Sequence, residues 1–262
     1  VDEAHGAHFP FVGRGPCAAG RGASVSISSA HKTLPALGST ALLFTDGSFS
    51  PAAVREKTAL FGTSSPSYLL MASIDWARAY LTEGAGGAAY RAVAAETARL
   101  RAQINKRGVF RALCEADGGS LDPTRLTVDT GRAGLSGDQA GKHLEQDYNI
   151  WPEMTDRDRV VCILTCADTA EELERLGAAF AALEQFAAAA PFRPCPPPPA
   201  PRMRRRIREA VFAPRRMLAL NLAAGCVSAS SIAPYPPGVS VVAPGEEITR
   251  EIIEYLAAVG YD

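Results

Sequence analysis

The residue with the clearest potential for chemistry is Lys32, in the stretch GASVSISSAHKTLPAL at residues 22–37. A lysine among small and apolar residues at the end of an expected strand is unusual, because removing an ammonium group from water is costly. The stretch predicts that Lys32 is buried. Burial favours the neutral form of a lysine, and a neutral amine is a nucleophile toward aldehydes. Lys32 is therefore a candidate Schiff-base lysine.

An acidic partner for such a lysine lies near the start of the sequence, in VDEAHG at residues 1–6. Pyridoxal phosphate is the usual aldehyde held by a catalytic lysine, and its ring nitrogen needs an acidic group that keeps it protonated. Strand alternation places Asp2 and Ala4 on one face and Glu3 on the other. Asp2 is the candidate partner of the ring nitrogen, and Ala4 leaves room for a flat ring.

Three further polar residues complete the candidate set. His5 ends the expected strand and could bond a ring substituent such as a phenolic oxygen, Ser29 offers a hydroxyl to a phosphate, and His31 could contact phosphate or a substrate carboxylate. Taken singly, each residue also has a plainer structural interpretation. Asp2 could be a turn or cap residue, the histidines could be surface or core residues, and Lys32 could be a surface lysine with a partly covered stem.

The elements that must position these residues follow from the hydrophobic pattern and from start and stop signals. A Ser-Pro pair starts one expected helix, and glycines end two of them. Thr169 is the expected N-cap of a long helix with acidic residues in its first turn, and Ser136 opens another. Strands are expected at residues 1–6, 23–28, 40–44, 122–130, 158–167 and 238–244, and helices at 65–84, 88–108, 135–150, 169–190 and 246–260. A turn is expected at Pro237-Gly238, and the last helix has an apolar stripe made of Ile248, Ile252, Tyr255, Leu256 and Val259.

The composition indicates an ordinary globular protein of 262 residues, 47% hydrophobic, with a net charge of −1. This charge predicts neither a nucleic-acid nor a membrane partner, and no apolar run has the roughly 18–20 residues that cross a bilayer. Six scattered cysteines predict reduced thiols and a cytoplasmic protein, and no spacing predicts a metal site. The arginine-rich run at residues 202–216 is either a patch for an acidic partner or, as we favour, a solvated face.

A proline-rich stretch, PFRPCPPPPAP at residues 191–201, is the clearest expected domain boundary. It predicts a linker between an α/β portion and a C-terminal domain at residues 202–262. Before the linker, we expect a division between residues 1–108 and a small α/β domain at residues 109–190. The sequence does not begin with Met, and we expect it to be the C-terminal part of something longer.

The motifs DEAHGAH (2–8) and SAHKTLPAL (29–37) together resemble the Orn/Lys/Arg decarboxylase family. The likeness continues in order through residues 63–75, 121–130, 134–140 and 233–246. It implies an α/β fold in which part of an aspartate-aminotransferase-like large domain of fold type I precedes a smaller α/β domain and a C-terminal α+β domain. It also implies a homodimer or larger assembly and pyridoxal phosphate as cofactor.

The resemblance assigns roles residue by residue. It implies that Asp2 pairs with the ring nitrogen, that Ala4 lies against the ring, and that His5 is close to the cofactor. Lys32 would form the Schiff base, with Ser29 and His31 facing the phosphate and the lysine's surroundings; this makes Lys32 and His31 the implied catalytic pair. Thr63 or Ser64 would reach the phosphate of a neighbouring subunit. The implied reaction is loss of the α-carboxylate of arginine, lysine or ornithine, which yields an amine and CO2.

The sequence also departs from the family pattern. Gly38-Ser39 stands where a glutamine is usual after HKTLPAL, and GCVSAS, with Cys226 and Ser230, replaces a GRISAE-like stretch. The glycine- and serine-rich phosphate loop and the stacking aromatic of the family do not occur before Asp2. Two alternatives to a decarboxylase therefore stay open: a non-catalytic homologue that binds a partner, and an aminotransferase that keeps the cofactor.

Overall fold

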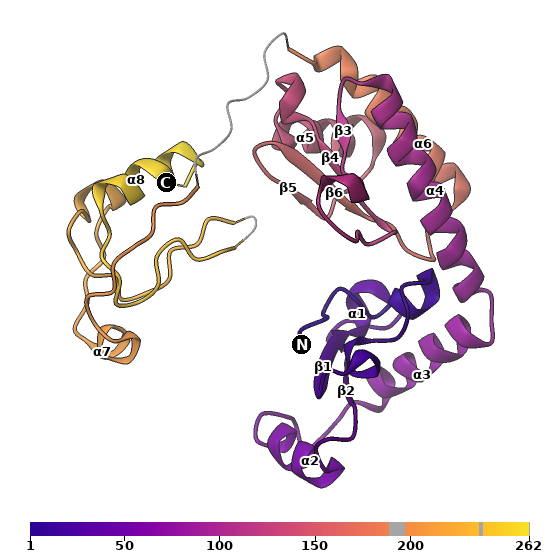
Figure 1. Cartoon of the computed structure of the whole chain (residues 1–262), viewed down its shortest axis with the longest axis horizontal. Coiled ribbons are helices and arrows are strands. Elements are labelled where there is room, and N and C mark those ends of the chain that lie inside the picture. The colour runs from indigo at the N-terminus through magenta and orange to yellow at the C-terminus, as the bar shows by residue number, and fades with distance from the viewer. Residues whose placement is uncertain (189–196, 236–237, 262) are drawn as a thin grey trace.

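The structure of this chain is a computed structural model that describes residues 1–188, 197–235 and 238–261. The described residues form a first segment with a two-stranded sheet, a central unit with a four-stranded sheet, and a C-terminal unit with little regular structure (Figure 1). Both sheets are antiparallel throughout. Helices pack against the sheets, so the fold is mixed α/β, as expected.

The first segment is built around β1 (Val25–Ser29) and β2 (Ala41–Thr45), which pair from end to end. The chain's first residues run parallel to β1, where Glu3 N donates to Ile27 O at 2.8 Å. Asp2 makes only an isolated bridge, so the strand expected at residues 1–6 is shorter than predicted. The short helix α1 (Ala30–Thr33) follows β1 directly and carries Lys32.

Three helices lead from the first segment to the central unit: α2 (Pro51–Ala59), α3 (Tyr68–Thr82) and α4 (Gly86–Arg107). Figure 1 shows that α4 extends from the first segment to the central unit. Its buried side chains recur every three or four residues, which is the period of one helix face. The long helix α4 therefore contributes to the packing of both parts.

The central sheet has the strand order β3-β4-β6-β5. Its two inner strands alternate buried and less buried residues, because successive side chains of a strand point to opposite faces. The helices α5 and α6 pack on this sheet and on each other, and α4 packs beside α6. The bounds are β3 (Arg111–Ala112), β4 (Arg125–Asp129), α5 (Gly137–Tyr148), β5 (Met154–Thr155), β6 (Arg159–Ile163) and α6 (Ala170–Leu183).

Helices α5 and α6 begin at the two caps that the sequence predicts. The Ser136 side chain accepts from the backbone of Gln139, and the Thr169 side chain accepts from that of Glu172. In both cases the third helical residue bonds back to the cap, which satisfies two backbone donors reciprocally. Thr169 and Ser136 are thus confirmed as N-caps.

Gly137, the first residue of α5, touches the turn between β5 and β6. A Cβ atom at this position would lie 2.1 Å from the carbonyl oxygen of Arg159 and 2.2 Å from that of Asp156. The Gly137 amide also donates to the carbonyl of Arg157 at 3.2 Å. The start of α5 therefore packs backbone against backbone on the sheet, which only glycine permits.

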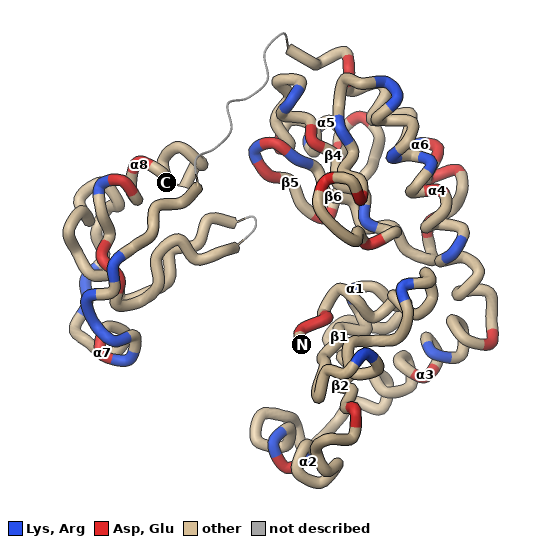
Figure 2. The backbone as a smooth tube through the Cα atoms, viewed as in Figure 1, with Lys and Arg blue, Asp and Glu red and all other residues tan. Residues whose placement is uncertain are grey.

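The C-terminal unit has a separate core at the apolar face of α8 (Arg250–Ala258). Ile248, Ile252 and Leu256 are buried, as the expected apolar stripe requires. The strand expected at residues 238–244 reduces to the isolated bridge between Ile232 and Val242. The arginine-rich run includes the short helix α7 (Ile207–Phe212), where Figure 2 shows basic residues close together. Most of the proline-rich linker and Pro237 of an expected turn lie outside the described residues.

Two further helical expectations differ from the structure. The helix expected from Ser65 begins at Tyr68 instead, because Ser67 provides the N-cap by accepting from Leu70 N. Helix α2 was not expected, since none of its residues is buried and its sequence has no apolar stripe. Short 3-10 helices occur at Phe9–Val12, Ala18–Arg21, Glu115–Asp117, Gly131–Ala133, Glu184–Phe186 and Leu220–Leu222.

Candidate functional site

Lys32 is exposed, so the expectation of a buried lysine is wrong for this structure. The reason lies in the geometry of α1. Ala30 and Thr33 are three residues apart on the buried face of its single turn, and Tyr90 fixes that face by donating a hydrogen bond to the Thr33 carbonyl. Lys32 lies between these positions in sequence and projects its amine outward.

The amine of Lys32 meets His5, as the two motifs together suggest. The Lys32 Nζ and His5 Nε2 atoms are 3.4 Å apart, although 27 residues separate them in the sequence. The parallel pairing of the chain start with β1 brings them together, because it aligns Ala4 with Ser29, where Ser29 N donates to Ala4 O at 3.3 Å. His5 directly follows Ala4, and Lys32 follows Ser29 by three residues on α1, so their side chains meet.

Asp2 lies on the exposed face of this pairing. Asp2 is the bridge partner of Ile27, which is 49% exposed, and the residues that flank Ile27 in β1 are buried on the other face. The Asp2 carboxylate is exposed and accepts from the backbone of Ala4 at 2.9 Å, while Ala4 itself is half-buried in the turn that follows. An acidic group thus occupies an open surface on the same side as Ile27.

The remaining two candidates precede Lys32: Ser29 ends β1, and His31 belongs to α1. Ser29 occupies the N-cap position but makes no side-chain cap hydrogen bond there. The His31 ring is exposed, and its Nδ1 lies 2.7 Å from the carbonyl oxygen of Thr40. Because a carbonyl only accepts, Nδ1 carries the proton of this bond, and Nε2 is the nitrogen left for another contact. His31 therefore also ties α1 to the start of β2.

Sequence reasoning missed the residues that hold His5 from its other side. Arg125, the first residue of β4, donates from Nη2 to His5 Nδ1 at 2.9 Å. Its Nε lies 4.0 Å from Oδ2 of Asp122. These residues lie about 120 positions from His5, so no local pattern links them. A charged residue at the start of a strand whose buried positions are apolar is the one signal in the sequence.

The second histidine of DEAHGAH, His8, has a structural role. Its ring is 1% exposed, and Nε2 lies 3.0 Å from Oδ1 of Asp122 and 2.9 Å from Oγ1 of Thr124. The ring also stacks on Tyr90, with the ring centres 5.6 Å apart. The contacts of His8 with Asp122 and Thr124 thus connect the first segment to the loop that leads into β4.

The electrostatics of this network follow from burial and from its charges. Burial, with Arg125 and Lys32 nearby, lowers the pKa of His5 from its ordinary value, against weaker opposing effects of Glu153 and Asp122. Burial would raise the pKa of Asp122, but hydrogen bonds from His8 and Thr124 to its carboxylate outweigh it and lower the pKa. The site therefore favours a neutral His5 beside an ionised Asp122.

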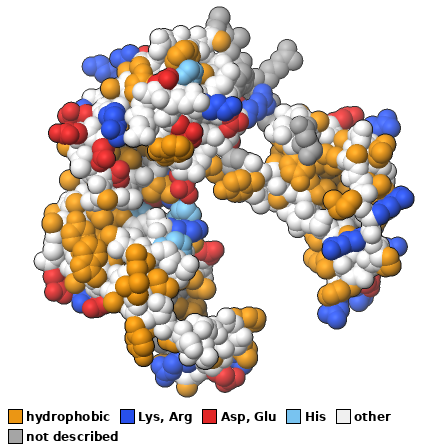
Figure 3. Space-filling model, turned by 180° about the vertical axis from the view of Figure 1, so that it is seen from behind, with side chains coloured by type: hydrophobic (Ala, Val, Ile, Leu, Met, Phe, Trp, Pro, Cys, Tyr) orange, Lys and Arg blue, Asp and Glu red, His pale blue; other side chains and the backbone are white. Residues whose placement is uncertain are grey.

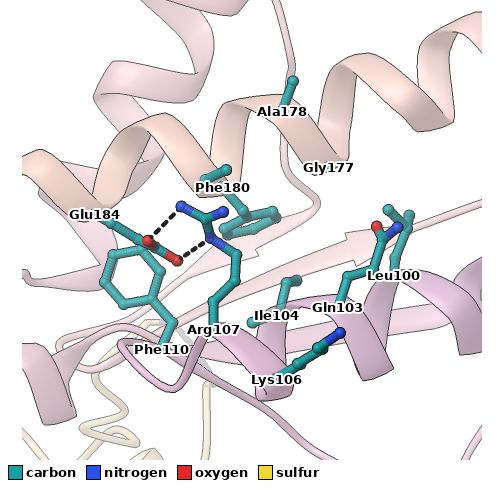
Figure 4. Close-up of a pocket in the computed structure, with 11 residues that line it drawn as sticks. Leu100, Gln103, Ile104, Lys106, Arg107, Phe110, Gly177, Ala178, Phe180 and Glu184 are labelled. Carbon is teal, nitrogen blue, oxygen red and sulfur yellow. Dashed lines mark hydrogen bonds and ion pairs between the residues drawn. The ribbon is translucent and has the colours of Figure 1, made fainter.

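A cavity of about 540 Å³ lies elsewhere, between α4 and α6. Figure 4 shows the Arg107 guanidinium paired with the Glu184 carboxylate at its edge through two hydrogen bonds of 2.7 Å. Phe110 and Phe180 contribute apolar walls. None of the sequence-predicted site residues lines this cavity.

Within the described ranges, no three or more His, Cys, Asp and Glu residues gather as they would to hold a metal ion. In the same ranges no helix is long and apolar enough to cross a membrane. The residues that depart from the family pattern have the following local structure. Ser39 adopts a left-handed conformation with φ 68°, Cys226 is partly buried, and the Ser230 carbonyl accepts from Ser228.

Two family models match the chain in the expected order. The model of the Orn/Lys/Arg decarboxylase major domain matches residues 1–116, and the model of the C-terminal domain of the same enzymes matches residues 192–261. This chain belongs to the Orn/Lys/Arg decarboxylase family. The resemblance seen in DEAHGAH and SAHKTLPAL is thereby confirmed. The domain limits at residues 108, 190 and 202 stay a prediction.

Two of the curated proteins that are similar to this chain are named arginine decarboxylases. The arginine decarboxylase of Bacillus subtilis is 32% identical over 272 residues, which cover 98% of this chain and 54% of that protein. The arginine decarboxylase of Bacillus anthracis is 30% identical with the same coverage. The chain thus spans about half the length of the curated relatives it matches.

Solved lysine decarboxylases share the fold. The Escherichia coli constitutive enzyme superposes with a TM-score of 0.72 at 18% identity, over 90% of this chain and 46% of the other. The Francisella novicida enzyme gives a TM-score of 0.69 at 19% identity, over 89% and 44%. The expected mixed α/β fold, shared in part with a larger enzyme, is confirmed.

Proposed function

We propose that this chain carries the lysine-bearing part of the active site of a pyridoxal-phosphate-dependent decarboxylase. The reaction removes the α-carboxylate of arginine, lysine or ornithine as CO2 and leaves the corresponding amine. Membership of the family and the names of the relatives support the reaction class. The observation that carries the proposal is the amine of Lys32, 3.4 Å from His5, at the end of a strand pair whose open face presents Asp2.

The residues at this site fit the cofactor by their chemistry. An exposed primary amine can condense with an aldehyde, an exposed carboxylate can bond a protonated ring nitrogen, and a small alanine beside it leaves space for a flat ring. The Ser29 hydroxyl, which makes no cap bond, is a donor of the kind that phosphate accepts. We therefore assign Lys32, Asp2, Ala4, His5, Ser29 and His31 to the cofactor site.

When bound, pyridoxal phosphate supplies an aldehyde that captures amines and a ring that accepts the electron pair left when CO2 departs. Lys32 would hold the cofactor through its side-chain amine. Asp2 would accept a hydrogen bond from the protonated ring nitrogen and so favour the ring's role as electron acceptor. Ser29 and the free Nε2 of His31 bind anionic groups, and His5 orients the amine of Lys32.

We also propose self-association and a reducing, cytoplasmic compartment. Large apolar side chains are exposed over the part of the molecule that carries β1, β2, α2 and α3, where Figure 3 shows them gathered. Thr63 and Ser64 are exposed beside this surface and stay candidates for contact with a neighbouring subunit's phosphate. Five described cysteines are free, which suits a reducing compartment.

The test uses the whole protein with pyridoxal phosphate, borohydride reduction and peptide mass mapping, and CO2 release from each basic amino acid. Lys32→Ala should lose the reduced adduct and all CO2 release. Lys57→Ala, which removes an exposed lysine of α2, is the matched control and should retain both. A wild-type protein with neither adduct nor CO2 release would support a non-catalytic homologue, and keto-acid product would support an aminotransferase; either result overturns the proposal.

A further inference from the structure

Arg125 is held at two points of its guanidinium group. Nη2 donates to His5 Nδ1 at 2.9 Å, and Nε lies 4.0 Å from Oδ2 of Asp122. The side chain is 28% exposed, and its Nε is buried without a hydrogen-bond partner of its own. Asp122 in turn is bonded by His8 and Thr124 through its other oxygen. The guanidinium group therefore has a defined place between a fixed carboxylate and the imidazole.

The bond from Arg125 determines which nitrogen of His5 carries a proton. A guanidinium group has only donors, so His5 Nδ1 must accept and cannot carry a hydrogen. A neutral imidazole has one N–H, and that hydrogen must then be on Nε2. Nε2 is the atom that lies 3.4 Å from Lys32 Nζ. The single N–H of the ring is thus directed at the amine.

The charges around His5 favour the neutral ring that this bonding needs. Arg125 and Lys32 are cations on opposite sides of the ring, and with burial they lower the pKa of His5. Glu153 and Asp122 are the anions that act in the opposite direction, and their effect is smaller. Protonation of Nδ1 would also bring its N–H against the donors of Arg125. The hydrogen bond from Arg125 and the charges around the ring therefore both favour a neutral His5.

We propose that Arg125 is a positioning residue that fixes His5 in the Nε2–H tautomer and so aims its only ring hydrogen at Lys32. His5 Nδ1 is then occupied by Arg125, and Nε2–H is the ring group that faces the Lys32 side chain. Arg125, from the central unit, thereby orients a ring that the proposed function assigns to the site of the cofactor lysine. That consequence rests on the proposed function, whereas the tautomer does not.

The test measures the tautomer directly in the cofactor-free whole protein. Histidine is labelled with ¹⁵N, and long-range ¹H–¹⁵N correlation spectra separate protonated from bare ring nitrogens, with His5 assigned from a His5→Asn variant. At pH 7 the wild type should have a hydrogen on Nε2 and a bare Nδ1. A hydrogen on Nδ1 in the wild type would overturn the proposal without any arginine variant.

Substitutions then test the role of Arg125. Arg125→Met, which removes the charge and the donors, should give a mixture of tautomers and raise the pKa of His5, because the Arg125 cation is one of the groups that lower it. Arg125→Lys keeps a charge and a donor and should preserve most of the Nε2–H form. Arg111→Met is the matched control, because Arg111 belongs to the same sheet and pairs with Asp117. It should leave His5 unchanged.

The outcomes separate this inference from the proposed function. An unchanged His5 tautomer and pKa in a folded Arg125→Met protein would overturn the inference, whatever the activity. If Arg125→Met does not fold, the wild-type and Arg125→Lys spectra decide. Wild-type protein without CO2 release would instead count against the proposed function and leave the tautomer result standing.

Discussion

The first segment and the central unit place their apolar side chains differently. In the central unit Phe180, Leu126 and Leu144 are at most 1% exposed and belong to one continuous core. In the first segment Ile27 is 49% exposed and Leu43 is 39% exposed, although both belong to the sheet beside the candidate site. Packing thus fixes the central unit, whereas the site has little core of its own.

Polar contacts compensate for this difference. His8 bonds Asp122, and Arg125 bonds His5, and each contact joins the first segment to the start of β4. Tyr90 of α4 adds a bond to the backbone of α1. The comparison indicates that the chemistry-bearing residues are positioned by the central unit through a few specific hydrogen bonds. Four predictions test it, from the largest expected free-energy effect to the smallest.

Removing core volume from the central unit should have the largest effect on stability. Phe180→Ala leaves a cavity beneath α6 and should lower the free energy of unfolding by about 3–5 kcal/mol. Ile27→Ala, in the open face of the first segment, should change it by less than about 0.5 kcal/mol. Urea titration followed by circular dichroism measures both. Similar losses in the two variants would contradict the contrast in packing.

Breaking the connection at Asp122 should have the next largest effect. Asp122→Asn weakens charge-assisted bonds to a buried histidine and should cost about 2 kcal/mol at pH 7. Because the folded pKa of Asp122 is below its ordinary value of 3.8, its contribution is present above that pH and is lost as the pH falls further.

The gap in stability between wild type and Asp122→Asn should therefore narrow when the pH is lowered through the region below about 4. Denaturant titrations at pH 7 and near pH 3 measure this gap. Asp75→Asn, at an exposed aspartate of α3, serves as the control and should show almost no loss at either pH. A gap that is independent of pH would indicate that the ionised carboxylate is not the stabilising group.

Changing the open face should affect chemistry and leave stability intact. Asp2→Asn removes the charge assigned to the ring nitrogen and should lower turnover of the whole enzyme at least tenfold, about 1.4 kcal/mol in the barrier. Cofactor retention should fall much less, and the free energy of unfolding should change by less than about 0.5 kcal/mol. Asp46→Asn, at an exposed aspartate after β2, is the control. Equal loss of turnover and cofactor would count against the role of Asp2.

The cap of α6 should give the smallest effect. Thr169→Ala removes the acceptor for the Glu172 amide and should lower the free energy of unfolding by about 1 kcal/mol. Thr169→Ser keeps the hydroxyl and should retain most of that stability. Thermal unfolding of the three proteins measures the difference, and turnover should not change. A loss of turnover with stability unchanged would mean that α6 affects the site by another route.

The sequence predicts the parts of the fold that local rules decide. Thr169 and Ser136 carry complete cap signals, so the starts of α5 and α6 were foreseen. Helix α2 has a cap but no buried face, and its apolar pattern gave no signal. The expected strand at residues 238–244 became a single bridge, because strand formation depends on a partner that a local pattern does not specify.

The candidate site divides in the same way. The resemblance assigned Lys32 and His5 to one site, and their side chains lie 3.4 Å apart. The exposure of Lys32 was not foreseen, because burial depends on which elements cover a residue and not on its sequence neighbours. Arg125 was missed for a related reason, since its contact with His5 spans 120 residues. The sequence thus supplied the candidate residues, and the structure was needed to identify the side chains that contact them.

The backbone contact at Gly137 limits how this chain can vary. Any side chain there, alanine included, would collide with the carbonyl oxygens of Arg159 and Asp156, which belong to the main chain and cannot rotate away. A saturation library at this codon should return glycine alone among folded clones. Gly13 and Gly22, which have open space around them, should accept asparagine despite their positive φ angles.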